Sequence, residues 1–205
     1  MNLLRTIKRF FSLGVELTSR FFLLVYIVLI GSCTSSVYLQ MANENPARLL
    51  DLEDSLKTEG LTEKIIQSLF IAHKNLGTSQ MKIQNYKKAK EHFLRAQELF
   101  TKDTMSIYNY LLCEGHLLYK TGKKKKLWDA IQKYNKAAQL IPTLGEPHYF
   151  VGKAYGRIGS RDFDLILESY EKALGLSLSD SLRLVIDQAH QQVSQREKQY
   201  IDFWK

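Results

Sequence analysis

The sequence predicts an all-α fold: a short helical solenoid of about three hairpins, with a short helix before them and a capping helix after them. Three observations predict it. The 205-residue chain has only three prolines, and it is rich in Leu, Lys, Gln and Ala, which have high intrinsic helix propensity. A pattern of small and aromatic residues occurs three times, at separations near 40 residues. An apolar stripe of helical period then runs through residues 180–205.

The repeated pattern belongs to the second helix of each hairpin. It reads Ala89-x3-Phe93-x2-Ala96, then Ala130-x3-Tyr134-x2-Ala137, then Ile166-x3-Tyr170-x2-Ala173. For the first helices, Gly152-x2-Tyr155 and the looser Gly115-x2-Leu118 mark two units, and Phe70 stands where the first unit would have its glycine. This pattern resembles the tetratricopeptide repeat (TPR) family, in which small residues let paired helices approach and the aromatic fills the gap to the next hairpin. The resemblance covers about residues 62–178, with repeats near 62–100, 104–142 and 145–178.

The flanks complete a helical domain over residues 46–205. Asn45-Pro46 opens a short helix that Gly60 ends, and Thr62 can cap the first repeat. We expect the loops within the hairpins at Gly77, Gly122 and Gly159, since glycine is common just after a helix. The capping helix would cover the open end of the solenoid. Trp128 and Trp204 are interpreted as packing residues.

The first 32 residues read as a signal peptide or membrane anchor. A basic stretch precedes the ten apolar residues 21–30, a length that fits a signal peptide and is too short to span a bilayer. The residues that follow, Ile30-Gly31-Ser32-Cys33, resemble the lipobox of bacterial lipoproteins. That resemblance implies cleavage before Cys33, a fatty acid such as palmitate on Cys33, and a polar tether over residues 33–45.

Two other interpretations of this segment remain open: an uncleaved anchor from Phe21 to Met41, and an organelle transit peptide. In the lipoprotein and anchor cases the basic residues stay in the cytoplasm, so the rest of the chain is exported. The expected location is therefore the bacterial cell envelope, membrane-anchored, with the repeats on the periplasmic side.

The TPR resemblance also implies a partner-binding groove lined by the first helices. Its lining mixes rings, amides and cations, which suits a protein or peptide partner with acidic side chains or a free carboxylate. The inward-facing positions are Lys74, Asn75, Asn109, Leu112, His116, Tyr119, Lys120, Tyr149, Lys153 and Arg157. A second interpretation stays open: Lys74, Lys120 and Arg157 are solvated cations near helix C-termini, where the helix dipole favours them.

No catalytic, metal or cofactor motif accompanies this lining. The five histidines are scattered, the two cysteines have no metal-ligand spacing, and no HExxH, phosphate loop or nucleophile motif occurs. Of the net charge of +8, the run from Lys123 to Lys126 supplies four, so a nucleic-acid surface is not indicated. The sequence thus predicts a non-enzymatic, membrane-tethered scaffold that helps to assemble an envelope complex. The alternative is a TPR chaperone or adaptor for exported clients on an uncleaved transmembrane anchor.

Overall fold

The computed structural model describes residues 37–205, and the regular structure in that part of the chain is helical. Contacts divide the chain into two compact units, with the boundary between Ala72 and His73. The all-α prediction is confirmed. None of the helices within residues 37–205 is long and apolar enough to cross a bilayer. Cys33 and the expected signal segment lie outside the described residues.

In the first unit, residues 37–44 are helical, which corrects the expectation of a polar tether across 33–45. The polar side chains there bond along the helix: Gln40 Nε2 donates to Glu44 Oε1 at 3.0 Å, and Asn43 Nδ2 donates to the Leu39 carbonyl at 2.9 Å. Polar composition therefore did not prevent a helix at the end of that segment.

The expected short helix is two helices, α2 (Pro46–Asp51) and α3 (Glu53–Glu59), which meet at Leu52. Asn45 caps α2 by accepting a hydrogen bond from the Arg48 amide at 3.3 Å. Glu53 and Asp54 lie in the first turn of α3. Acidic side chains there stabilise the start of a helix because they interact with the positive end of the helix dipole. That acidic pair explains why a new helix begins here.

Helix α4 (Glu63–Lys82) begins in the first unit and continues into the second. Thr62 Oγ1 accepts a hydrogen bond from the Ile65 amide at 3.3 Å, as expected of a cap. The expectation that Gly77 lies near a helix end is wrong, because Gly77 sits inside α4.

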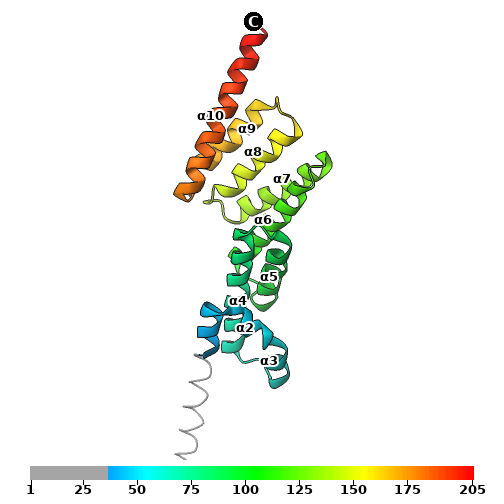
Figure 1. Cartoon of the computed structure of the whole chain (residues 1–205), viewed down its shortest axis with the longest axis vertical. Helices are drawn as coiled ribbons and strands as arrows, with labels where there is room; N and C mark the ends of the chain where they lie inside the picture. Colours follow the sequence, from blue (N-terminus) through cyan, green and yellow to red (C-terminus); the bar gives the residue numbers. More distant parts are fainter. Residues whose placement is uncertain (1–36) are drawn as a thin grey trace, which may run out of the picture. The chain divides into compact units, whose positions relative to one another are not determined.

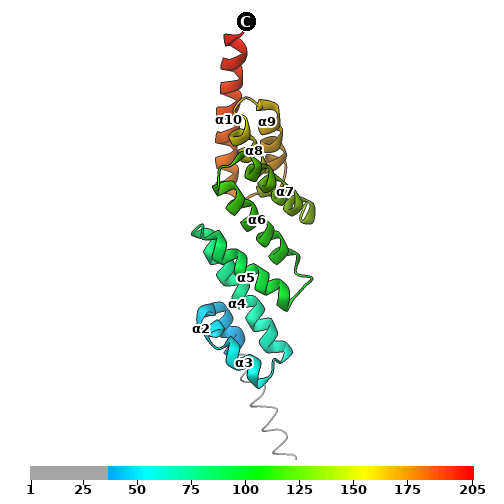
Figure 2. The same cartoon turned by 90° about the vertical axis from the view of Figure 1, so that its right-hand side faces the viewer.

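Three helical hairpins and a final helix follow one another along the chain (Figure 1, Figure 2). The hairpins consist of α4 with α5 (Tyr86–Leu99), α6 (Thr104–Lys120) with α7 (Lys124–Leu140), and α8 (Glu146–Ile158) with α9 (Phe163–Leu174). From α5 to α10 (Asp180–Phe203), each helix packs on the next. The predicted solenoid of three TPR-type hairpins is confirmed.

A glycine on the first helix of each hairpin faces the repeated aromatic on the second. A Cβ added to Gly115 would lie 2.4 Å from the Tyr134 ring, and one added to Gly152 would lie 2.6 Å from the Tyr170 ring. The equivalent pair in the first hairpin is Gly77 with Phe93, at 2.9 Å. The first repeat therefore carries its packing glycine at 77, and the assignment of that position to Phe70 is wrong by seven residues.

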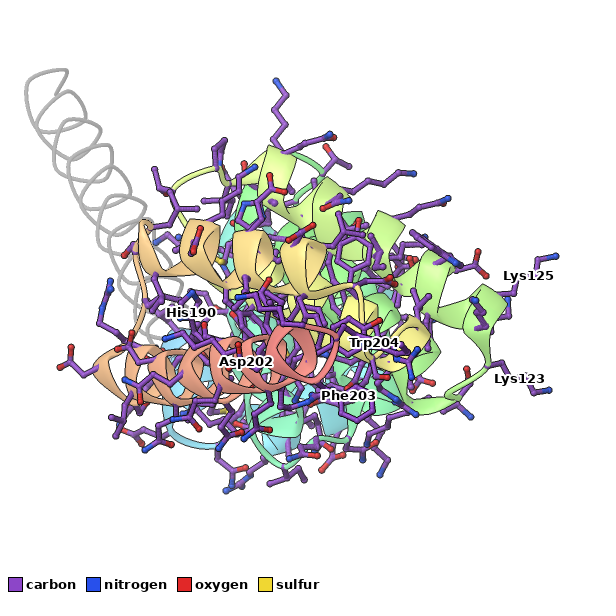
Figure 3. The ribbon with its side chains drawn as sticks, turned by 90° about the horizontal axis from the view of Figure 1, so that it is seen from above. Lys123, Lys125, His190, Asp202, Phe203 and Trp204 are labelled. Carbon is purple, nitrogen blue, oxygen red and sulfur yellow. The ribbon has the colours of Figure 1, made fainter. Side chains whose placement is uncertain are left out.

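The predicted capping helix is also confirmed: α10 packs on α9 and buries Ile186 and Val193. Its last turns extend past the start of α9 (Figure 1). Trp204 is 67% exposed and so is not a packing residue, contrary to the prediction (Figure 3). Trp128 is 44% exposed, and its ring meets that of Tyr155 edge-on.

Candidate functional site

Aromatic rings and cations from α5, α6 and α8 meet on one surface of the second unit, which we call the aromatic–cation face. The first helices supply most of it, as the repeat pattern predicts. Its members are Tyr86, Tyr119, Lys120, Tyr149, Lys153 and Arg157, of which Tyr149 is buried. Five of these six are predicted groove residues; Tyr86, at the start of the second helix of hairpin one, is not.

Lys153 occupies the centre of this face. Its Nζ lies 5.3 Å from the centre of the Tyr149 ring, 5.8 Å from that of Tyr119 and 5.9 Å from that of Phe150. These are cation–π distances. Burial lowers the pKa of the Lys153 ammonium, and the nearby Arg157 charge lowers it further. Within residues 37–205, no carboxylate forms an ion pair with Lys153.

Lys120 and Arg157 each hold a backbone carbonyl of the preceding repeat. Lys120 Nζ donates to the Gln84 carbonyl just after α4, at 3.1 Å. Arg157 Nη1 donates to the Tyr119 carbonyl in the last turn of α6, at 2.8 Å. The Arg157 guanidinium also lies over Gly122, where a Cβ would come within 2.6 Å of Nη2.

The final helix repeats this contact, since Arg196 Nη2 donates to the Ser160 carbonyl just after α8 at 3.0 Å. The three donor–acceptor pairs are separated by 36, 38 and 36 residues, which is one repeat each. We call them the cation–carbonyl bridges. They favour the helix-end interpretation for Lys120 and Arg157, because each cation satisfies a carbonyl at a helix C-terminus.

His116 and Leu112, both predicted to line the groove, are buried beneath the face. The His116 ring lies 4.3 Å from the rings of Tyr86 and Phe150, centre to centre, and its Nδ1 is 3.0 Å from Tyr134 Oη. Burial lowers the pKa of His116 to about 4, with further lowering by the charges of Lys153 and Lys120. The imidazole is thus a neutral packing group under the rings.

The first repeat contributes differently from the prediction. The ammonium of Lys74 pairs with Asp103 at 3.1 Å, and Asp103 also caps α6 through the Ser106 amide at 2.8 Å. Counted from the packing glycine at 77, the position equivalent to Lys120 and Arg157 is Lys82. The seven-residue register error therefore led to Lys74 and Asn75. Asn109 is half-buried on α6, about two turns before His116.

A cleft of about 720 Å³ lies elsewhere, between α7, α8 and α9. None of the predicted groove residues lines it. Its lining comprises Asn135, Ala138, Gln139, Pro142, His148, Lys172, Gly175 and Leu176. The aromatic–cation face is thus defined by its ring and cation contacts and not by an enclosed volume.

No family model and no curated protein matches this chain. Among solved structures, two crystal structures of MamA are similar. One has 24% sequence identity and a TM-score of 0.39, covering 69% of this chain and 83% of MamA. The other has 22% identity and a TM-score of 0.37, covering 71% of this chain and 97% of MamA. The hairpin assignment above rests on the contacts of this chain itself.

Proposed function

We propose that this protein is a membrane-tethered interaction scaffold whose aromatic–cation face binds an acidic segment of a partner protein in an envelope complex. The observation that carries the proposal is Lys153: a half-buried ammonium over three aromatic rings, with no ion-pairing carboxylate among residues 37–205. A carboxylate from a partner would supply the missing counter-charge.

Burial disfavours the charged form of Lys153, and an anion bound beside it would favour that form again. Hydrogen bonds between a charged donor and a charged acceptor are about twice as strong as neutral ones. Lys153 is therefore suited to binding an anion. His116 is neutral and buried, so it adds no acid–base group to this surface.

Lys120 and Arg157 contribute positive potential to the same face while they bridge the repeats. Their charges would raise the encounter rate with an acidic partner. Replacing either would also break a cation–carbonyl bridge, so a loss of binding in such variants would have two causes. Lys153 makes no such bridge and is the sharper position to change.

Lys153→Met tests this proposal because the methionine keeps much of the apolar stem and removes the charge. Lys125→Met is the matched control: it removes one charge from the exposed first turn of α7, where the side chain points away from the protein (Figure 3). Full-length protein is captured from membranes after mild crosslinking, and the recovered partners are quantified. We expect about tenfold lower recovery with Lys153→Met and none of that loss with Lys125→Met. Equal recovery from both variants would refute the binding role of the face.

The membrane tether is a separate part of the proposal and has its own test. It is supported by the basic stretch, the apolar run and the Ile30-Gly31-Ser32-Cys33 motif in the sequence. A radiolabelled fatty acid should be incorporated by the full-length protein and not by Cys33→Ala. Label retained by Cys33→Ala, with the protein still in the membrane fraction, would favour an uncleaved anchor instead.

A further inference from the structure

A second cleft, of about 380 Å³, lies where α6, α8 and α10 begin. Its walls combine leucine side chains with a few polar groups from these helix starts and the loops before them. The lining residues are Tyr108, Leu144, Glu146, Ser177, Leu178, Ser179 and Leu182. This cleft takes no part in the aromatic–cation face described above.

Glu146 brings a carboxylate into this cleft without a cation to balance it. Burial raises the pKa of the Glu146 carboxyl, and the neighbouring Tyr108 hydroxyl opposes that rise. Among residues 37–205, no Lys, Arg or His forms an ion pair with Glu146. Its place at the first position of α8 is electrostatically favourable. That explains a carboxylate at the helix start but leaves its burial uncompensated.

Tyr108 is a second, independent observation at the same place. Its side chain is 2% exposed and lines the cleft, and its Oη makes no hydrogen bond within the described part of the chain. Burial raises the pKa of Tyr108, and both the charge of Glu146 and the approach of its carboxylate to the Tyr108 hydroxyl raise it further, so the two groups face each other without a well-formed hydrogen bond. Because the great majority of buried polar side-chain atoms have a partner, an unsatisfied Oη beside a carboxylate indicates room for one.

The Ser177 backbone and the Ser179 hydroxyl, which also line the cleft, are already engaged. The Ser177 amide donates to the Thr143 carbonyl at 2.9 Å, and its carbonyl accepts from the Gly145 amide at 3.0 Å. Ser179 Oγ caps α10 by accepting from the Leu182 amide. The Glu146 carboxylate, Tyr108 Oη and the Ser177 hydroxyl are therefore left to meet a ligand, between walls formed by Leu144, Leu178 and Leu182.

We propose that this cleft binds a cationic side chain, lysine or arginine, of the polypeptide held by the scaffold. The ammonium or guanidinium would donate to the Glu146 carboxylate and to Tyr108 Oη, and its aliphatic stem would pack on the leucines. This inference rests on the proposed function in one respect: the ligand is taken to be a polypeptide that also meets the aromatic–cation face.

The distance between the two sites constrains the sequence of that polypeptide. Glu146 and Lys153 lie on α8 seven residues apart, which is about 10 Å along the helix axis. An extended chain covers about 3.3 Å per residue, so the same distance corresponds to about three residues. The bound segment is therefore one with a basic and an acidic residue about three positions apart.

The site itself is tested with n-butylammonium chloride as the probe and n-butanol as the neutral control. Full-length protein in detergent micelles carries ¹³C-labelled leucine methyl groups, and their shifts are followed during each titration. We expect saturable shifts with butylammonium, at least about tenfold weaker binding in Glu146→Gln, and weaker binding in Tyr108→Phe. Equal shifts with butanol, or unchanged binding in Glu146→Gln, would overturn the proposal.

Two further variants keep the test decisive. If Glu146→Gln unfolds, Tyr108→Phe carries the experiment, because it removes one oxygen and keeps the ring; unchanged binding there would then overturn the proposal. Lys125→Met, which removes a distant surface charge, should leave butylammonium binding unchanged. The acetylated peptides Lys-Ala-Ala-Glu and Ala-Ala-Ala-Glu separate the two proposals. Glu146→Gln should remove the advantage of the first peptide, and Lys153→Met should weaken both. If Lys153→Met weakens neither peptide, the proposed function fails while the butylammonium result still stands.

Discussion

Gly115→Ala is the substitution whose consequence the structure determines most directly. Gly115 lies in the middle of α6, against the fully buried ring of Tyr134 on α7. A Cβ at this position would lie 2.4, 2.7 and 2.9 Å from three ring carbons, whereas ordinary contacts are 3.4–4 Å. The ring or the helix would have to move by about 1 Å to relieve this overlap.

The cost can be estimated from its parts. Overpacking a buried site costs about 1–3 kcal/mol. Moving the ring also weakens the contact between Tyr134 Oη and His116 Nδ1, 3.0 Å apart, worth about 1 kcal/mol. Alanine is favoured over glycine inside a helix by about 1 kcal/mol, which offsets part of this. We expect the free energy of unfolding to fall by about 2 kcal/mol, and the Tm by about 4–8 °C for a chain of this size.

Gly156→Ala is the matched control, because Gly156 is also inside a helix but has space beside it. Its Cβ would approach only Ile166 Cδ1, at 3.6 Å, which is ordinary van der Waals contact. This variant should gain up to about 1 kcal/mol from helix propensity alone. Urea unfolding followed by far-ultraviolet circular dichroism measures both variants. If Gly115→Ala were stabilised as Gly156→Ala is, the packing role of Gly115 would be refuted.

Two further predictions concern pH and helix capping. Since the pKa of His116 is about 4 when folded and 6.5 when unfolded, only the unfolded chain binds this proton between those values. Stability should therefore fall by up to roughly 3 kcal/mol from pH 7 to pH 4. The raised pKa of Glu146 acts in the opposite sense, so the effect of His116 is isolated by comparing two proteins. The urea midpoint of unfolding, measured from pH 7 to pH 4, should change less in His116→Gln than in the unsubstituted protein. An equally steep change in both would contradict the lowered pKa of His116. Asp103→Ala removes both the α6 cap and the pair with Lys74, and should cost about 1 kcal/mol or more at pH 7. Asp103→Asn keeps the cap and should lose less, and urea unfolding distinguishes the two. Burial would raise the pKa of Asp103, but its hydrogen bonds to Ser106 and Lys74 lower it. The Asp103 contribution is thus present above the unfolded pKa and is lost as the pH falls through the lower folded value.

The hairpins could be predicted because their packing depends on residues at regular spacing. Phe93, Tyr134 and Tyr170 all face a glycine of the partner helix, as the repeat pattern indicated for two of the three units. The glycine of the first unit was misassigned because glycine serves two purposes: it ends helices, and it allows close approach within them. The sequence near Gly77 does not distinguish these two roles.

The candidate site could be predicted only in part, because the choice between surface and interior depends on neighbouring helices. Tyr119 and Lys153 were expected on one surface and meet there, whereas Tyr149, expected beside them, is buried under Lys153. His116 was expected beside them and is instead covered by the rings of Tyr86 and Phe150. The partners of Lys120 and Arg157 are backbone carbonyls about one repeat away, and side-chain patterns do not indicate such acceptors.

The cation–carbonyl bridges have a consequence for how the array responds to damage. Each bridge joins one repeat only to the repeat before it. Its loss should therefore weaken the interface between those two repeats and leave the other interfaces unchanged. Arg196 makes α10 the equivalent of the first helix of a hairpin. The array could therefore be lengthened by inserting whole hairpins before α10, with a cation–carbonyl bridge at each new interface.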